Sequence, residues 1–76
     1  MINILDLLQD IRPDSDFRAS SDFIEDYLLD SFDIMALTSD LEKSFNIQIK
    51  TDDIVPENYA SIEAISNLVR KCGGTI

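Results

Sequence analysis

The sequence predicts a small all-α domain, a bundle of three to four helices with a long loop between the first two helices. Apolar residues recur at helical spacing in three separate stretches of the chain. The one stretch that alternates like a strand, Ile47-Gln48-Ile49, is too brief to pair into a sheet, and we expect an extended connector with both isoleucines turned inward. A chain of 76 residues with 45% apolar residues can build one core, so we expect a single domain over residues 1–76.

The first helix is expected to follow Asn3, a good N-cap residue, and to stop before Pro13. Its apolar stripe is formed by Ile4, Leu5, Leu8 and Ile11. We expect this short helix to pack against the central one.

From Arg12 to Leu29 neither a helical nor a strand period holds for long. Isolated apolar residues, among them Phe17, Phe23 and Tyr27, interrupt a polar stretch. We therefore predict a long loop that its aromatic residues pin to the core, and a loop of this length in so small a domain is often functional.

The central helix is predicted over residues 30–45, with Asp30 or Ser31 as its N-cap and Asn46 at its C-terminus. Its core-facing stripe consists of Ile34, Leu37, Thr38, Leu41 and Phe45. The opposite side, which we expect to face water, carries Phe32, Met35 and Ala36 together with Ser39 and Lys43. Scattered exposed apolar residues are common, but an apolar patch beside an exposed serine also fits a docking surface.

The last third of the chain is predicted to hold one short turn and one final helix. Thr51 is expected to cap a turn that Pro56 interrupts, and Ser61 to cap the final helix. That helix should end at Gly73 and pack through Ile62, Ile65, Leu68, Val69 and Cys72.

The charge of the chain limits its partners. Six basic and fifteen acidic residues give a formal net charge of −9, which repels nucleic acid and anionic lipid and favours basic protein surfaces. The single cysteine, Cys72, has no disulfide partner in the chain, and the amino terminus resembles neither a signal peptide nor a membrane span. We therefore expect a cytoplasmic protein without a membrane span.

Several kinds of self-contained chemistry are excluded by residue type. The chain has no histidine for a Ser/His/Asp or Cys/His arrangement, and its only glycines lie at the tail, so no phosphate-binding loop exists. The spacing of Asp14, Asp16 and Glu25 superficially resembles a calcium loop, but Arg18 and Ala19 stand where a ligand and the turn glycine belong. We predict no catalytic residue and no metal site.

Ser31 could be a helix cap and nothing more, since serine is common at helix starts. However, Leu28-Leu29-Asp30-Ser31-Phe32-Asp33 followed by the amphipathic helix resembles the acyl carrier and peptidyl carrier protein family. The likeness extends to the downstream segment from Ile49 to Ile65 and to the short first helix and long loop, and so covers essentially the whole chain.

This resemblance implies an acyl-carrier-protein-like bundle that is not an enzyme. By the resemblance, Ser31 receives 4′-phosphopantetheine from coenzyme A through a phosphopantetheinyl transferase, and the arm carries an acyl or aminoacyl group as a thioester. The group would pass from an acyl- or aminoacyl-loading (adenylating) enzyme to a downstream synthase or transferase, with the carrier as a monomer. The implied partner-binding residues are Asp30, Phe32, Asp33, Met35, Ala36, Ser39, Asp40 and Glu42.

The chain departs from the family pattern in two places. Many relatives have glycine where Tyr27 stands, and Ala36 occupies a position that is often acidic in fatty-acid-type carriers. The segment from Val55 to Tyr59 is closer to carriers loaded by adenylating enzymes, including D-alanine and peptide-synthetase-like systems. The resemblance leaves fatty-acid, polyketide, nonribosomal-peptide and D-alanine-transfer pathways open, and the alternative is a small acidic helical interaction module without a prosthetic group.

Overall fold

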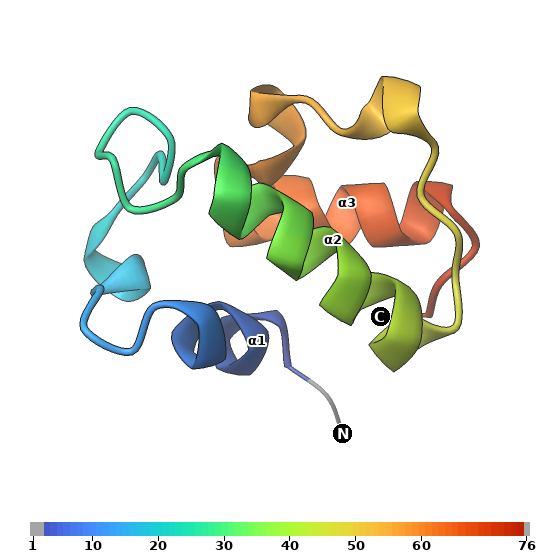
Figure 1. The fold of residues 1–76 in the computed structure, drawn as a ribbon, viewed down its shortest axis with the longest axis horizontal. Coiled ribbons are helices and arrows are strands. Elements are labelled where there is room, and N and C mark those ends of the chain that lie inside the picture. The colour runs from blue at the N-terminus through green and yellow to red at the C-terminus, as the bar shows by residue number, and fades with distance from the viewer. Residues whose placement is uncertain (1–2, 76) are drawn as a thin grey trace.

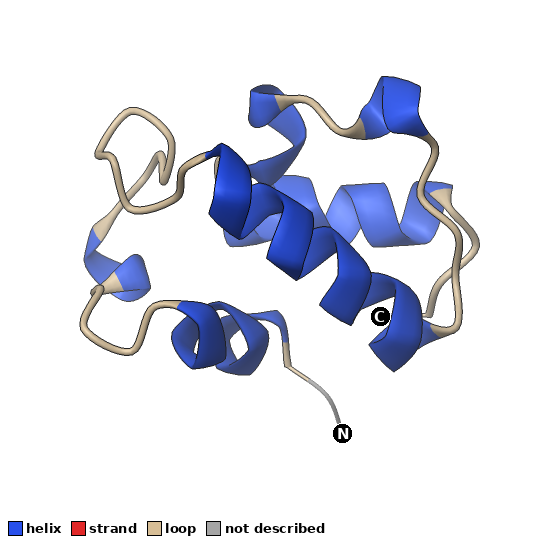
Figure 2. Ribbon diagram, in the orientation of Figure 1, coloured by secondary structure: helices blue, strands red, loops and turns tan. Residues whose placement is uncertain are grey.

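The computed structural model describes residues 3–75, and in this part of the chain it is helical without strands (Figures 1 and 2). The helices are α1 (Ile4–Ile11), α2 (Ser31–Phe45) and α3 (Ile62–Lys71), with 3-10 turns η1 (Phe17–Ala19), η2 (Thr51–Asp53) and η3 (Pro56–Tyr59). In Figure 1, α2 crosses in front of α3, and α1 lies beside them. Because α1 contacts both α2 and α3, the predicted packing of the first helix on the central one is confirmed.

The boundaries of α1 follow from its first and last residues. The Asn3 side chain accepts a hydrogen bond from the Leu5 N–H at 2.9 Å, and the helix ends one turn after Leu8, whose carbonyl accepts the Arg12 N–H. Ile4, Leu5 and Leu8 are buried, as the apolar stripe predicts, and Ile11 packs partly buried against the same core.

The long loop between α1 and α2 is fastened to the rest of the fold. The buried rings of Phe17 and Phe23 meet edge to face with centroids 5.1 Å apart. The Phe23 N–H donates to the Ala60 carbonyl at 2.6 Å, which ties the loop to the segment after η3. Tyr27 corrects the prediction for this loop, because its ring is 92% exposed and does not pin the loop to the core.

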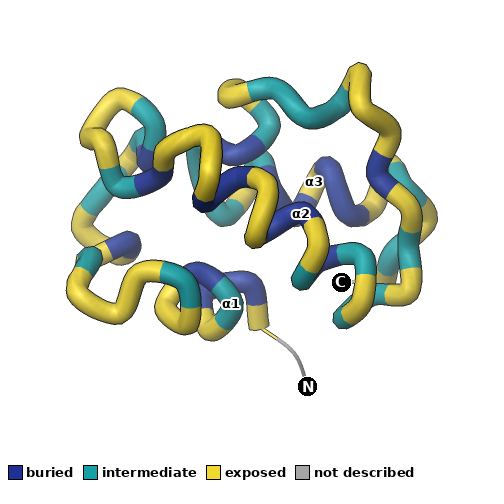
Figure 3. The backbone as a smooth tube through the Cα atoms, viewed as in Figure 1, coloured by how far each residue is buried: buried dark blue, intermediate teal, exposed yellow. Residues whose placement is uncertain are grey.

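The central helix α2 presents its predicted stripe to the core (Figure 3). Leu37 and Leu41 are fully buried, and the Thr38 hydroxyl donates to the Ile34 carbonyl at 2.7 Å. Since that bond uses the hydroxyl proton of Thr38, the 2.6 Å contact with the Tyr59 hydroxyl has Tyr59 as the donor. Burial raises the pKa of Tyr59, so this phenol stays protonated and the bond persists at neutral pH.

The end of α2 and the following connector also agree with the sequence. Asn46 adopts the left-handed conformation with φ of 53°, which asparagine tolerates better than most residues. Ile49 is buried, Ile47 is half-buried, and the Ile49 N–H donates to the Glu42 carboxylate at 2.9 Å. The connector is therefore held by α2 itself.

The expected cap of the next turn is wrong. Lys50 occupies the N-cap position of η2 without a side-chain hydrogen bond, and Thr51 is the first residue of the turn. Pro56 begins η3 rather than continuing η2, because its ring fixes φ at a value suited to the first position of a turn.

The final helix α3 begins and ends as the sequence predicts. Ser61 caps it by accepting the Ala64 N–H at 3.0 Å. Gly73 follows with φ of 94°, a conformation that strains other residues, and the Gly74 N–H closes the end on the Val69 carbonyl. Cys72 is half-buried against the core, as expected for a small apolar side chain.

Candidate functional site

Ser31 is the first residue of α2, and it is exposed. The cap of this helix is made by its neighbours. The Asp30 carboxylate accepts the Asp33 N–H at 2.9 Å, and the Asp33 carboxylate accepts the Asp30 N–H at 3.2 Å, which is a reciprocal capping box. Since Asp30 is the cap, the start of α2 does not depend on the hydroxyl of Ser31.

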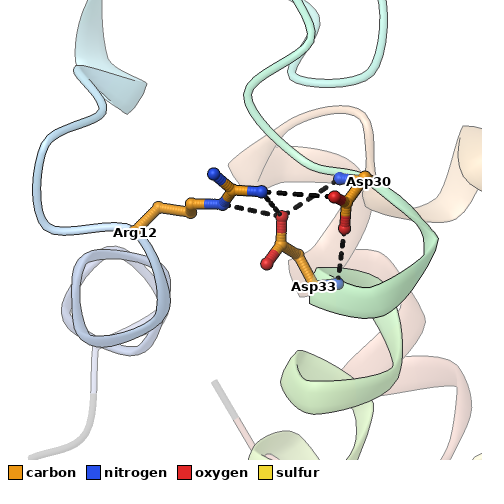
Figure 4. Close-up of polar contacts among 3 residues, drawn as sticks. All are labelled: Arg12, Asp30 and Asp33. Carbon is orange, nitrogen blue, oxygen red and sulfur yellow. Dashed lines mark hydrogen bonds and ion pairs between the residues drawn. The ribbon is translucent and has the colours of Figure 1, made fainter.

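Arg12, at the end of α1, reaches both carboxylates of this box (Figure 4). Its Nη2 lies 2.7 Å from an Asp33 oxygen and 3.3 Å from an Asp30 oxygen, and its Nε donates to Asp33 at 2.8 Å. The Asp33 side chain is only 11% exposed, whereas the Arg12 and Asp30 side chains are 45% and 63% exposed. The Arg12–Asp33 pair is therefore shielded from water and joins α1 to α2, whereas the Arg12–Asp30 pair is exposed to solvent.

The environment of Asp33 favours its ionised form. Burial raises the pKa of this carboxyl, but hydrogen bonds from the Arg12 side chain and the Asp30 N–H, with the Arg12 charge, outweigh burial and bring the pKa below its ordinary value of 3.8. The same hydrogen bond and the Asp33 charge raise the pKa of Arg12. Both groups are thus charged across the physiological range.

Exposed apolar side chains precede and follow Ser31 in the sequence. Among residues 3–75, the large apolar side chains that are exposed are Tyr27 at 92%, Phe32 at 81% and Met35 at 70%. All three lie within one short segment that brackets Ser31. Ala36 and Ser39 are also exposed, as the helical spacing predicts.

The acidic residues of the predicted partner face are placed less uniformly. Asp30 is exposed, and Asp40 and Glu42 are half-buried, with one Glu42 oxygen held by the Ile49 N–H. Asp33 does not offer an open charge, because its carboxylate is buried and paired with Arg12. The Asp33 side chain joins α1 to α2, and contact of Asp33 with a partner stays a prediction.

Two residues of this region were not identified as site residues by the sequence. Arg12 ends the first helix, and nothing in the sequence shows that it meets acids 18 and 21 positions later. Tyr27 has a left-handed backbone with φ of 59°, and the glycine found there in many relatives was the signal for this conformation.

A comparison with protein families identifies the chain. A family model described as the phosphopantetheine attachment site matches residues 3–69, so the chain belongs to the phosphopantetheine-binding carrier family. Neither the curated proteins nor the solved structures give a significant match. The matched domain is the site of covalent 4′-phosphopantetheine attachment, and this group is the cofactor of the chain. Domains of this kind are typically non-catalytic and interact with a phosphopantetheinyl transferase and with synthesis enzymes.

The residues at the start of α2 fit this cofactor. Its phosphodiester is an anion, and the first turn of a helix offers backbone N–H groups and a partial positive charge. A phosphodiester of this kind forms through a hydroxyl, and Ser31 presents an exposed hydroxyl at this turn. Within residues 3–75 no helix is long and apolar enough to cross a membrane.

Proposed function

We propose that this protein carries acyl or aminoacyl groups as thioesters on a 4′-phosphopantetheine arm attached to Ser31. One observation carries the assignment of Ser31: the residue is exposed at the start of α2, while the capping box of Asp30 and Asp33 closes the end of the helix without its hydroxyl. The start of α2 is therefore capped without the Ser31 hydroxyl. The family supports the arm, and the position of Ser31 supports its attachment point.

The attachment step needs no base from this chain. The Ser31 oxygen would attack the β-phosphorus of coenzyme A, forming the phosphodiester and releasing adenosine 3′,5′-bisphosphate, while a group of the magnesium-dependent transferase takes the hydroxyl proton. When bound, the arm supplies a terminal thiol that holds the acyl group. The chain itself contributes an anchor, a rigid helix start and a surface for its partners.

The partners we propose are a phosphopantetheinyl transferase, an adenylating loading enzyme and a downstream synthase or transferase. The exposed side chains of Phe32, Met35 and Ala36 offer an apolar contact, and the net charge of −9 favours partners with a basic rim. A monomer in the reducing cytoplasm suits this role. The similarity of the segment from Val55 to Tyr59 to adenylation-loaded carriers favours an adenylating enzyme as the loading partner.

The test is to incubate the protein with coenzyme A and a broad-specificity phosphopantetheinyl transferase and to measure its intact mass. The wild type should gain one phosphopantetheine, and Ser31→Ala should gain none. Because Asp30 caps the helix, Ser31→Ala should change the free energy of unfolding by less than about 0.5 kcal/mol.

The outcomes separate the possible errors. A wild type that gains no mass would contradict the carrier function and favour the helical interaction module. An adduct that persists in Ser31→Ala would place the arm on another residue. A large loss of stability in Ser31→Ala would show that the serine has the structural duty we assign to Asp30.

A further inference from the structure

We infer that Tyr27 is a contact residue for the phosphopantetheinyl transferase, and that its exposed ring enters an apolar pocket with a basic rim on that enzyme. This inference rests on the proposed attachment at Ser31. It adds to the partner surface a residue of the long loop, at a position where many relatives have glycine.

The first step is the turn that contains Tyr27. The Leu28 N–H donates to the Phe23 carbonyl at 2.8 Å, and this bond closes one helical turn of the loop. Inside it, the Tyr27 N–H donates to the Ile24 carbonyl at 3.1 Å. These two nested bonds form a Schellman motif, in which one residue has a left-handed backbone and is usually glycine. Tyr27 occupies that position, with φ of 59°.

The second step is that this turn does not account for a tyrosine. Phe23 and Leu29 are buried on either side of the turn and hold it to the core, whereas the Tyr27 side chain is 92% exposed. Glycine would form the same turn with less strain. A strained backbone that local packing does not compensate is typical of functional positions. The exposed ring is therefore the feature of Tyr27 that needs an explanation outside the fold.

The third step is the distance from Tyr27 to Ser31. The two residues are four positions apart, and a chain advances at most about 3.6 Å per residue, so their Cα atoms lie within about 14 Å of each other. A standard interface covers about 800 Å² on each partner, which corresponds to a disc of about 16 Å radius. The transferase must bring coenzyme A to the Ser31 hydroxyl itself, so an interface centred on Ser31 includes Tyr27. Enzymes that act on the thiol work one arm length away, so they are not bound to this distance.

The fourth step is the charge around the ring. Glu25 and Asp26 directly precede Tyr27 in the chain, Asp30 follows it, and all three acidic residues are exposed. Tyrosine is enriched in protein interfaces because its ring supplies a large apolar contact. An apolar ring among carboxylates fits an apolar pocket bordered by lysine or arginine. A second copy of this chain carries the same net charge of −9 and would be repelled.

The experiment measures arm transfer to Tyr27→Ala and Tyr27→Gly by a phosphopantetheinyl transferase. In both variants kcat/KM should fall roughly fivefold, the effect of losing one interface side chain. The fall should appear in KM, with kcat unchanged, because the ring binds the enzyme and takes no part in the reaction. Tyr27→Ala keeps the strained backbone and Tyr27→Gly relieves it, so an equal fall in both variants assigns the effect to the ring.

Two controls make the result specific. Tyr27→Phe keeps the aromatic ring and should recover most of the wild-type kcat/KM. Gln48→Ala removes an exposed side chain from the connector of residues 47–49, which lies across the molecule from the long loop in Figure 1, and should leave arm transfer unchanged.

A binding measurement that needs no kinetics uses the two tyrosines of the chain. Tyr27 is 92% exposed and Tyr59 is fully buried, so labelling with 3-fluorotyrosine gives one fluorine signal from each environment. Tyr27→Phe assigns the two signals. Addition of unlabelled transferase without coenzyme A should shift the Tyr27 signal and leave the position of the Tyr59 signal unchanged.

The outcomes separate this inference from the carrier function. Wild-type arm transfer in Tyr27→Ala and Tyr27→Gly, or an unchanged Tyr27 signal on addition of the transferase, would overturn the inference and leave the carrier function intact. A Tyr27 signal that shifts on loading alone would assign the ring to the arm, and a wild-type dimer that Tyr27→Ala dissociates would assign it to a second copy. Either result would also overturn the inference. A wild type that takes no arm would overturn the proposed function, and the inference with it.

Discussion

Tyr27 combines two properties that are rarely found together in one residue. Its backbone is left-handed with φ of 59°, a conformation that costs a non-glycine residue about 1–2 kcal/mol, and its ring is 92% exposed. Packing therefore does not offset the strain. The residue lies four positions before Ser31, so its exposed ring adds to the apolar side chains that are close to Ser31 in the sequence.

Tyr27→Gly should preserve the fold and leave the protein as stable as the wild type or up to about 1 kcal/mol more stable. Glycine removes the left-handed strain, but its greater freedom in the unfolded chain costs about 0.5–1 kcal/mol. Urea denaturation measures the change. Tyr27→Ala is the matched control, because it removes the ring but keeps the strain, and it should stay within about 0.5 kcal/mol of the wild type. A clear loss in both variants would mean that the ring packs against the protein.

At the scale of elements, α2 has two faces with different duties. Leu37 and Leu41 are fully buried, whereas Phe32 and Met35 on the other side are exposed. Both faces follow from the spacing of apolar residues along one helix, since a side chain every third or fourth position returns to the same side. The inner face holds the bundle together, and the outer face is the surface we propose for partners.

Met35→Glu should separate the two duties. The side chain is 70% exposed, so the free energy of unfolding should change by less than about 0.5 kcal/mol. Transfer of the arm by a phosphopantetheinyl transferase should fall roughly tenfold in kcat/KM, the effect of losing a contact worth about 1.4 kcal/mol.

Two controls accompany this variant. Asn67→Glu adds the same charge at an exposed position of α3 and should leave arm transfer unchanged. Leu37→Ala should lose about 2–5 kcal/mol of stability, because it opens a cavity in the core. Cooperative unfolding lost in Met35→Glu would show that Met35 belongs to the core.

The helices could be predicted from the sequence because their signals are local. Asn3, Asp30 and Ser61 each cap a helix through an N–H two or three residues away, so a short stretch contains both partners. Threonine is also a common N-cap residue, but Thr51 is the first residue of the 3-10 turn η2 and not its cap. The turn follows the connector of residues 47–49, which the Glu42 carboxylate holds by accepting the Ile49 N–H. This contact spans seven residues, and residue type alone does not reveal it.

At the scale of the whole molecule, the Arg12–Asp33 pair joins α1 to α2 and makes the stability depend on pH. The pKa of Asp33 is lowered in the folded protein, so the pair stabilises the fold above the ordinary carboxyl pKa. This stability is lost as pH falls through the lowered folded value. This pair could not be predicted from the sequence, because Arg12 and Asp33 are 21 residues apart and meet only when α1 packs on α2.

Urea denaturation of wild type and Arg12→Gln between about pH 6 and pH 2 checks this linkage. The wild type should lose more stability on acidification than Arg12→Gln, because the variant lacks the guanidinium, whose hydrogen bond is the largest influence that lowers the pKa of Asp33. Relief of the repulsion among the many acidic residues affects both proteins alike and cancels in the comparison. Parallel pH profiles would contradict the assignment of the pKa shift to Arg12.

The contact between the Phe23 N–H and the Ala60 carbonyl has a consequence for how cargo travels. It ties the long loop to the segment between η3 and α3, and the buried Phe17–Phe23 ring pair packs the loop against the core. The attachment point that we propose at Ser31 therefore belongs to a packed helical bundle and not to a flexible linker. The distance that a thioester can reach from this attachment point is then set by the length of the prosthetic arm. Each partner enzyme must therefore bring its catalytic centre within one arm length of the start of α2.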